Sequence, residues 1–242
     1  AELDSYDSVT AAVEALVGRE RDNDPQPFFG QRDRRLLKGL IASTKEAMAG
    51  PTPAQLLEVA RDQALLRRIA AGAPQHGRRL DEATTADSWA YGRLMSGVVN
   101  ALEVFEHPGL GQITSHDRLR LGHLFDQPSI LVVGAPLHAS RDGVAASSLM
   151  LALLFRELYR GFGTTRRRVV VIADEAPRLT DRIDFEEVSS VARGAGVSLV
   201  LAAQFVEQLA DEGQRHAILG NCATYVSMRT TSEISADYLA SR

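Results

Sequence analysis

The stretch Val169–Leu179, VVVIADEAPRL, runs five apolar residues directly into two adjacent carboxylates, Asp174 and Glu175. The burial of a strand does not explain why it should end in two acidic residues. A binding site at the edge of a sheet would explain it, because open α/β sheets bind their ligands beyond the carboxyl ends of parallel strands. The stretch therefore predicts a buried strand with a chemical site at its end.

The sequence around this strand alternates between apolar runs and helical patterns. The runs are SILVVGA (129–135), RVVVIAD (168–174), VSLVLAA (197–203) and ATYVSMR (223–229), and the helical patterns span about 143–159, 184–193, 205–219 and 232–242. Continuous apolar strands separated by helices are typical of a parallel sheet covered on both faces. We therefore expect an α/β domain over residues 127–242.

The sequence before Pro128 is helical in pattern. Apolar residues recur at helical spacing in SVTAAVEALV, RRLLKGLIASTKEAM and YGRLMSGVVNALEVF. Thr52–Pro53 predicts a helix start, with Thr as the cap and Pro in the first turn. We expect an all-α domain at residues 28–126, preceded by an N-terminal helix and linker at 1–27 that belong with the α/β domain.

Composition narrows the class of protein. Of the 242 residues, 45% are hydrophobic and 24% are charged, as in a soluble globular protein. The formal net charge is -4, so the chain as a whole is not basic enough to be a general binder of polyanions. The single cysteine, Cys222, excludes an internal disulfide framework. The N-terminus carries no secretory signal, and the most apolar run, 143–161, is shorter than the ~20 apolar residues that cross a bilayer.

The charge is uneven along the chain. Residues 31–80 carry ten Arg or Lys against four acids, whereas residues 1–30 carry two Arg against seven acids. The basic stretch has two interpretations: a solvated helix face, or a docking surface for an acidic partner. Trp89 and the Phe28–Phe29 pair are interpreted as core or domain-seam anchors, because no basic–aromatic alternation surrounds them.

An apolar strand that ends in Asp-Glu is the Walker B pattern of P-loop nucleoside triphosphatases. Asp174 would hold Mg²⁺ on the phosphates, and Glu175 would accept the proton of the attacking water. A strand end capped by two acids is the structural alternative. The next apolar strand ends in Gln204, which would sense the γ-phosphate or orient the water.

Arg193 follows the helical pattern between these two strands and precedes the turn residues Gly194 and Gly196. One interpretation is a cation that faces the C-terminal end of a helix dipole. The other is an arginine finger that reaches the nucleotide of a neighbouring subunit.

Three stretches taken together resemble a known family. They are VVVIADEAPRL (169–179), FEEVSSVARGAGVSLVLAAQFVEQL (185–209) and AILGNCATYVSMR (217–229). Their order, strand–DE, Arg-x-x-Gly, strand–Gln and Asn-Cys-x-Thr, resembles the ATPase portion of type IV secretion coupling proteins, the TraG/TraD group. The likeness covers residues 129–242, and PFFGQRDRRLLKGLI (27–41) is similar to the opening of that family's all-α domain.

The resemblance implies a RecA-like P-loop NTPase fold, a mostly parallel sheet with an inserted all-α domain, and a homo-hexamer that uses ATP and Mg²⁺. In these terms Glu175, Gln204 and Arg193 are the catalytic residues and Asp174 is the metal ligand. The family works at the cytoplasmic face of the bacterial inner membrane. There it recruits a relaxase–DNA complex or protein effectors and passes them to other type IV secretion components.

One departure from the family concerns the phosphates. The chain contains no G-x-x-x-x-G-K-[ST], so it lacks the loop that cradles the β- and γ-phosphates. That loop and the membrane-spanning helices lie upstream in the family, so we expect a fragment that starts after them. Such a fragment is inactive alone and contacts the membrane only through the missing segments. The competing explanation is a degenerate homologue that binds no nucleotide.

Two other functions stay open at this point. The all-α domain could be a non-catalytic module that binds the substrate of a secretion machine. A HerA/FtsK-type DNA translocase shares the sheet but not the large helical insertion.

Overall fold

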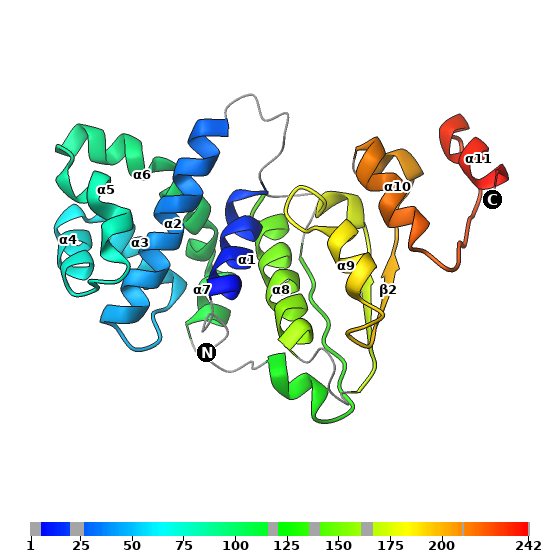
Figure 1. Cartoon of the computed structure of the whole chain (residues 1–242), viewed down its shortest axis with the longest axis horizontal. Helices are drawn as coiled ribbons and strands as arrows, with labels where there is room; N and C mark the ends of the chain where they lie inside the picture. The colour runs from blue at the N-terminus through cyan, green and yellow to red at the C-terminus, as the bar shows by residue number, and fades with distance from the viewer. Residues whose placement is uncertain are drawn as a thin grey trace.

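The computed structural model describes residues 6–19, 27–115, 121–135, 141–160, 167–209 and 211–241. Figure 1 shows a helical part at one end of the molecule and a small sheet with its helices at the other. Helices α1 (Tyr6–Val17) and α8 (Arg141–Arg160) lie between the two. The all-α block expected from the sequence is present, while the domain limits 1–27, 28–126 and 127–242 stay predictions.

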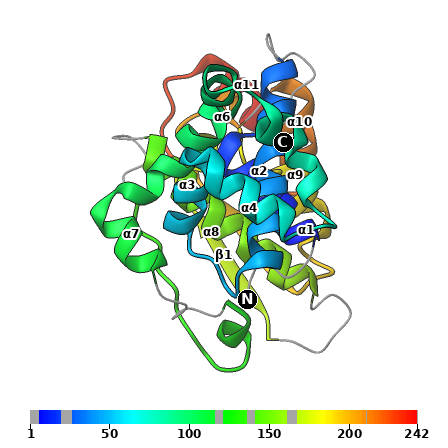
Figure 2. The same cartoon turned by 90° about the vertical axis from the view of Figure 1, so that its left-hand side faces the viewer.

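The helical part is built around one long helix, α2 (Pro27–Ala47), which contacts α1 and α3, α4 and α6 (Figure 2). The other elements of this part are α3 (Pro53–Arg61), α4 (Gln63–Ala71), η1 (Gly77–Leu80), α5 (Asp81–Thr85), α6 (Ser88–Leu102), η2 (Glu103–Glu106) and α7 (Pro108–Thr114). The short helix η3 (Leu121–Phe125) follows and contacts α8.

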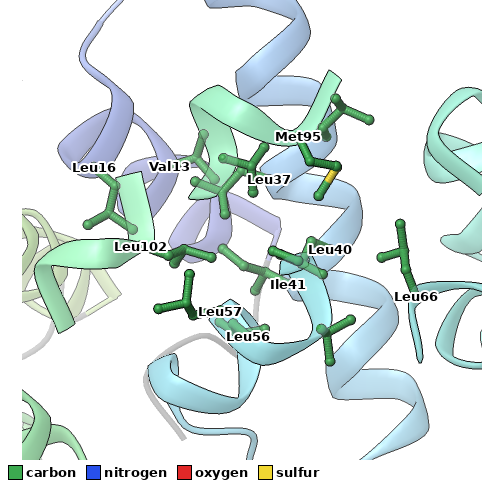
Figure 3. Packing of buried hydrophobic residues seen from close by; sticks show 14 of the residues in the cluster. Val13, Leu16, Leu37, Leu40, Ile41, Leu56, Leu57, Leu66, Met95 and Leu102 are labelled. Carbon is green, nitrogen blue, oxygen red and sulfur yellow. The ribbon is translucent and has the colours of Figure 1, made fainter. Parts of the chain in front are cut away.

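The core of this part is the apolar stripe of α2. Leu36, Leu37, Leu40 and Ile41 are at most 2% exposed. Figure 3 shows Leu37, Leu40 and Ile41 among apolar side chains of α3 and α6, which include Leu56, Leu57, Met95 and Leu102. Each such burial contributes about 1.5–3 kcal/mol, so the helical spacing read from the sequence corresponds to a real hydrophobic core.

The predicted helix start at Thr52 is confirmed by its hydrogen bonds. The Gln55 backbone N–H donates to Thr52 Oγ1 (3.3 Å), and the Thr52 N–H donates to Gln55 Oε1 (2.8 Å). This is a capping box, with Pro53 in the first turn, where it has no backbone donor to lose.

Helix α1 packs against both halves of the molecule. Val9, Val13 and Leu16 belong to the core of the helical part, whereas Ala11 and Ala15 belong to the core beside the sheet. Because apolar residues occupy more than one side of α1, the helix must be covered on more than one side. Helix α1 therefore contributes to both cores, and its assignment to the α/β domain stays a prediction.

The sheet consists of two parallel strands in the described residues, β1 (Val169–Ala173) and β2 (Val197–Leu201). Val169 pairs with Val197 and Ala173 with Leu201. The crossover between them contains η4 (Ala176–Arg178) and α9 (Phe185–Val191). The chain continues through η5 (Val206–Gln208), α10 (Glu212–Gly220) and α11 (Glu233–Ala240).

Two of the four predicted strands are not strands. Residues 129–135 and 223–229 have no regular secondary structure, and Ile130 is 93% and Met228 87% exposed. An apolar β-branched run favours an extended chain, but a strand also needs a neighbour in register. Neither segment has such a neighbour in the described part of the chain.

The expectation of a sheet covered on both faces is also wrong for this chain. Val171 and Ala173 are buried beneath the helices, whereas Val170 is 62% and Ile172 70% exposed on the other face. Alternate residues of a strand point to opposite faces, so the whole second face of β1 lacks a covering layer. A complete RecA-like sheet is therefore not seen here.

None of the described helices has the length and apolar character needed to cross a membrane. Helix α8, which contains most of the apolar run 143–161, instead buries Phe155 and Leu158 beside the sheet. This agrees with the prediction of a helix packed in a protein core.

Candidate functional site

The two carboxylates singled out in the sequence lie where β1 leaves the sheet. Asp174 is exposed and Glu175 is half-buried, directly after the last paired residue, Ala173. The Glu175 backbone N–H donates to Asp174 Oδ1 (3.0 Å). The parallel pairing puts this point at the C-terminal edge of the two strands, where α/β sheets bind ligands.

Backbone hydrogen bonds frame these two residues. The Ala202 N–H donates to Ala173 O (3.0 Å), and the Ala176 N–H donates to Ala202 O (3.0 Å). The chain of β1 is thus held to one residue of the neighbouring strand segment both before and after Asp174 and Glu175. The two acids therefore lie in a short loop whose two ends are held by backbone hydrogen bonds.

Glu175 adopts a left-handed backbone conformation, with φ 54° and ψ 40°. In the described ranges it is the one residue other than glycine with a positive φ. This conformation costs a side-chain-bearing residue about 1–2 kcal/mol, and such strain clusters at functional sites. The sequence contains no signal for it, because glutamate has no preference for this region.

The donor set at this edge fits one half of a magnesium–nucleotide site. Asp174 would offer a hard oxygen to Mg²⁺, which keeps most of its remaining ligands as water and phosphate. No group of three or more potential metal ligands occurs within the described ranges, so the protein would supply few ligands itself. The phosphate cradle is missing from all 242 residues.

Gln204 lies at the same edge, two residues beyond Ala202, and its side chain is exposed. The structure therefore brings the segments of Asp174, Glu175 and Gln204 together, as parallel pairing predicts. What these residues do to a nucleotide stays a prediction.

Arg193 is not part of this cluster. It is exposed and follows α9, in the turn that leads into β2. Gly196 O accepts the Val169 N–H (3.1 Å), so this turn lies beside the start of β1. The five residue steps from Val169 to Asp174 separate this turn from Asp174 by roughly 16 Å. A role for Arg193 would therefore have to act on the nucleotide of another subunit.

A set of contacts that sequence reasoning missed joins the loop after Glu175 to helix α1. The Arg182 guanidinium donates to Ala15 O (2.6 Å) and to Leu16 O, and Arg19 pairs with Asp184. Arg34 of α2 donates to Gly18 O (2.9 Å) from the other side. Arginines from both halves of the molecule thus bind carbonyls at the end of one helix, where cations also favour the helix dipole.

A second missed cluster holds the C-terminal helix. Glu207 accepts hydrogen bonds from the hydroxyls of Ser232 and Ser235, and Ser235 Oγ also accepts the Val206 N–H (3.0 Å). Hydrogen bonds from the Ser232 hydroxyl and, to a smaller extent, the Ser235 hydroxyl hold the pKa of Glu207 below its usual range. Ser232 caps α11, so this cluster fixes the start of the last helix.

Known proteins resemble this chain at two levels, the sequence of its C-terminal part and its fold. Residues 168–242 match the family described as the TraM recognition site of TraD and TraG. No curated protein sequence matches the chain significantly.

Among solved structures, the chain is similar to a bacterial conjugative coupling protein, TrwBdeltaN70, in its unbound monoclinic form, with 12% identity and a TM-score of 0.59. The match covers 90% of this chain and 51% of the coupling protein. This chain therefore spans about half the length of that protein, and both its helical and its α/β parts share the fold. Residues 168–242 are thus similar in sequence to the TraD and TraG family, and nearly the whole chain is similar in fold to a conjugative coupling protein.

Proposed function

We propose that this chain is the helical and Walker B portion of a coupling-protein ATPase, which couples ATP hydrolysis to the recruitment and transfer of DNA or protein in a type IV secretion system. The observation that carries the proposal is the position of Asp174 and Glu175. They end a parallel strand beside the Gln204 segment, inside the region that matches the TraD and TraG family. The complete protein would act as a hexamer at the cytoplasmic face of the bacterial inner membrane.

The uncovered face of β1 supports this function. Val170 and Ile172 expose apolar surface that a soluble core normally buries. The match to TrwBdeltaN70 leaves about half of that protein without a counterpart here. A phosphate-binding half of the nucleotide domain would cover this face and supply the missing cradle.

In the complete protein, ATP would supply the transferable phosphoryl group and Mg²⁺ would neutralise its charge. Asp174 would hold the metal, while Glu175 would orient the attacking water and take its proton. Gln204 would form a hydrogen bond at the γ-phosphate. Arg193 would donate to phosphate oxygens of a neighbouring subunit's nucleotide.

A non-catalytic receptor is the second candidate, and the family match of residues 168–242 favours it. In this case the chain would bind a relaxase–DNA complex, an effector, or a TraM-like component through residues 168–242, whose family description names TraM recognition. A HerA/FtsK-type translocase is less well supported, because the fold match extends over the helical part as well.

The chain by itself tests the phosphate argument. Titration with a fluorescent ATP analogue and Mg²⁺ should show weak or no binding, because no cradle holds the phosphates. Micromolar, Mg²⁺-dependent binding would mean that the nucleotide site lies elsewhere in this chain.

The role of the two acids is tested in a full-length protein that contains a phosphate-binding loop. Glu175→Gln should abolish turnover and spare ATP binding, because shape is kept and the proton acceptor is lost. Asp174→Asn should weaken Mg²⁺-dependent binding instead. Turnover of Glu175→Gln within a few-fold of wild type would contradict the assignment and favour the receptor.

Arg193 is tested by mixing subunits. Arg193→Ala should keep the fold and the ATP affinity and lose roughly 10³–10⁵ in rate, as arginine fingers do. Mixed with Glu175→Gln subunits, it should regain activity, because each subunit supplies what the other lacks. If Arg193→Ala lowers only the melting temperature, the residue is a helix-end cation.

A further inference from the structure

The single tryptophan of the chain, Trp89, lies on the surface of the helical part and not in its core. It is 70% exposed in the first turn of α6, next to the helix cap Asp87. The buried stripe of α6, which includes Met95 and Val98, lies on another side of the helix. The expectation that Trp89 anchors a core or a domain seam is therefore wrong. Tryptophan is among the residues most enriched at binding hot spots.

Arg93 lies over this ring. Its guanidinium carbon is 4.6 Å from the centre of the Trp89 ring, one helical turn further along α6. Stacking occupies the face of a guanidinium and leaves the donors on its edge available for a paired contact with a carboxylate.

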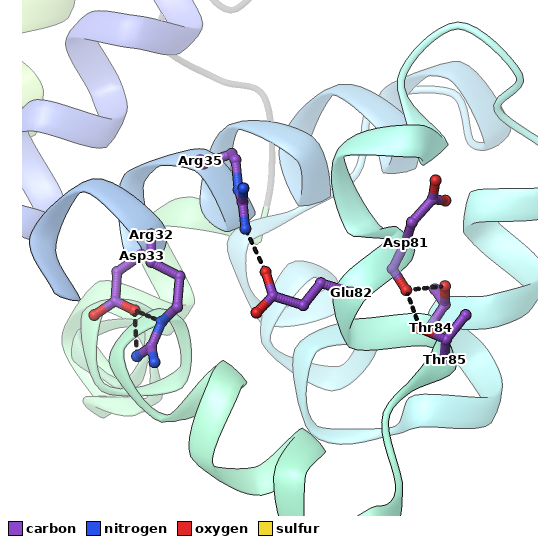
Figure 4. A network of polar contacts seen from close by, with 7 residues as sticks. All are labelled: Arg32, Asp33, Arg35, Asp81, Glu82, Thr84 and Thr85. Atoms are coloured by element: carbon purple, nitrogen blue, oxygen red, sulfur yellow. Dashed lines mark hydrogen bonds and ion pairs between the residues drawn. The ribbon is translucent and has the colours of Figure 1, made fainter. Parts of the chain in front are cut away.

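Neighbouring arginines already have carboxylate partners. Figure 4 shows Arg32 with Asp33 and Arg35 with Glu82. Within the ranges that the structure describes, the Arg93 guanidinium has no hydrogen bond or ion pair, only its stack on Trp89. The surface therefore carries one positive charge that no carboxylate of the described chain balances.

A hollow of about 540 Å³ opens beside the stacked pair. Ser88, Gly92 and Ser96, spaced by four residues on α6, line it together with Trp89 and Arg93, and Arg32 of α2 closes the other side. A side chain at Gly92 would meet nothing within 4 Å, so the space above the helix is open. Small residues on one side and an exposed ring on the other leave room for an extended backbone.

The opposite wall is fixed by close packing. Arg32 Nε and Nη2 donate to Asp33 Oδ1 at 3.1 and 2.9 Å, and both side chains are largely buried. A Cβ atom added at Gly97 would lie 1.8 Å from Asp33 Oδ2, which is a steric clash. Helices α2 and α6 therefore approach each other closely at this point. The two helices that line the hollow are therefore held close together beside it.

The chemistry of the hollow favours a peptide over a nucleic acid. Trp89 is the one aromatic side chain that lines the hollow, so it offers no series of stacking platforms for successive bases. One carboxylate of a bound peptide would balance the charge of Arg93, and a neighbouring apolar side chain of the same peptide would cover Trp89. The basic balance of residues 31–80 attracts an acidic segment over longer range.

We propose that this hollow docks a short acidic peptide segment of a partner protein, with its carboxylate on Arg93, an apolar side chain on Trp89 and its backbone along Ser88, Gly92 and Ser96. This surface belongs to the receptor role of the chain and does not depend on ATP hydrolysis. Its failure would leave the Asp174 assignment untouched, and the reverse is also true.

A random peptide library displayed on phage tests the proposal with the chain as it stands. Selection on the wild-type chain, with counter-selection on a Trp89→Ala, Arg93→Ala double variant, should enrich peptides that place Asp or Glu next to an aromatic or aliphatic residue. Because Trp89 is the only tryptophan, an enriched peptide should change the intrinsic tryptophan fluorescence in a saturable way. No enrichment, or enrichment of basic or uncharged peptides, would overturn the proposal.

Matched variants then locate the contact by the anisotropy of the labelled peptide. Arg93→Ala and Arg93→Lys should each weaken binding about tenfold or more, because lysine keeps the charge and loses the paired donors. Gly92→Gln should weaken binding by filling the hollow, while Asn100→Gln, on an exposed position of α6 outside the hollow, should not. Circular dichroism checks that each variant stays folded.

Two results of these measurements contradict the proposal directly. One is an enriched peptide that binds Arg93→Ala and Gly92→Gln as tightly as wild type. The other is a short oligothymidylate that displaces the peptide at lower concentration than a second acidic peptide does, which would assign the hollow to single-stranded nucleic acid.

Discussion

Glu175 combines a strained backbone with the position predicted for a catalytic acid. Its left-handed conformation is held by the hydrogen bonds of Ala202 to the residues on either side of the acidic pair. A side chain there is costly in folding, so its presence is better explained by chemistry than by stability.

Replacement of Glu175 by glycine should therefore stabilise the chain. Glycine adopts this conformation without steric cost but loses more freedom on folding, so the expected gain is up to about 1 kcal/mol. Urea denaturation of the chain without nucleotide measures the gain. Glu175→Gln, with the same backbone demand, should stay within about 0.5 kcal/mol of wild type. A glycine variant that is less stable than wild type would show that the side chain itself holds the loop.

At the scale of elements, helix α1 connects the loop after the acids with the helical part. Arg182 reaches the end of α1 from that loop, and Arg34 reaches it from α2. The two contacts place one helix end between the candidate chemical site and the candidate docking surface.

Loss of the Arg182 contact should loosen this junction. Arg182→Met keeps much of the side chain's length and removes the donors to Ala15 O and Leu16 O, so we expect a loss of about 1–3 kcal/mol in urea denaturation and faster hydrogen exchange in α1. Arg178→Met changes an exposed arginine of the same loop and should cost less than about 0.5 kcal/mol. Equal effects of the two substitutions would contradict the role of Arg182.

The attachment of α11 should depend on pH through Glu207. The pKa of Glu207 is lowered in the folded chain by the Ser232 and Ser235 hydroxyls. The stabilisation is therefore complete above the ordinary glutamate range and is lost as the pH falls through the lowered value.

The chemical shifts of α11 amides should follow this loss on acidification. Glu207→Gln should remove the transition, whereas Glu212→Gln, an exposed acid of α10, should leave it in place. A transition that persists in Glu207→Gln would assign it to another group.

At the scale of the whole molecule, the bare face of the sheet is the dominant feature. Val170 and Ile172 form apolar surface on the side of β1 opposite the helices, and Val200 of β2 lies beside them. Such a face drives association between copies when nothing covers it.

The double substitution Val170→Thr, Ile172→Thr should reduce this association, as measured by light scattering over a concentration series. Stability should change by less than about 1 kcal/mol, since both side chains are already exposed. Val171→Thr, on the buried face of the same strand, should instead cost about 1–3 kcal/mol, because it buries a hydroxyl. Unchanged association in the double variant would mean that another surface joins the copies.

Local patterns in the sequence were sufficient for much of this protein. Helical spacing predicted the stripe of Leu36, Leu37 and Leu40, and capping chemistry predicted the helix start at Thr52. The apolar runs that became β1 and β2 were predicted together with the acids at their C-terminal edge. These features depend on residues close in sequence, or on the general rule that parallel strands end at one edge, so a single sequence contains them.

Tertiary structure decided the rest, because it depends on which partners each segment finds. Residues 129–135 and 223–229 have the composition of strands, yet within the described part of the chain they join no strand ladder. Trp89 is on the surface because α6 buries a different side against α2. Arg193 and Asp174 belong to the same segment between β1 and β2, but the parallel crossover puts them at opposite ends of the strands. The left-handed Glu175 and the arginines at the end of α1 arise from contacts between distant segments, which no local pattern encodes.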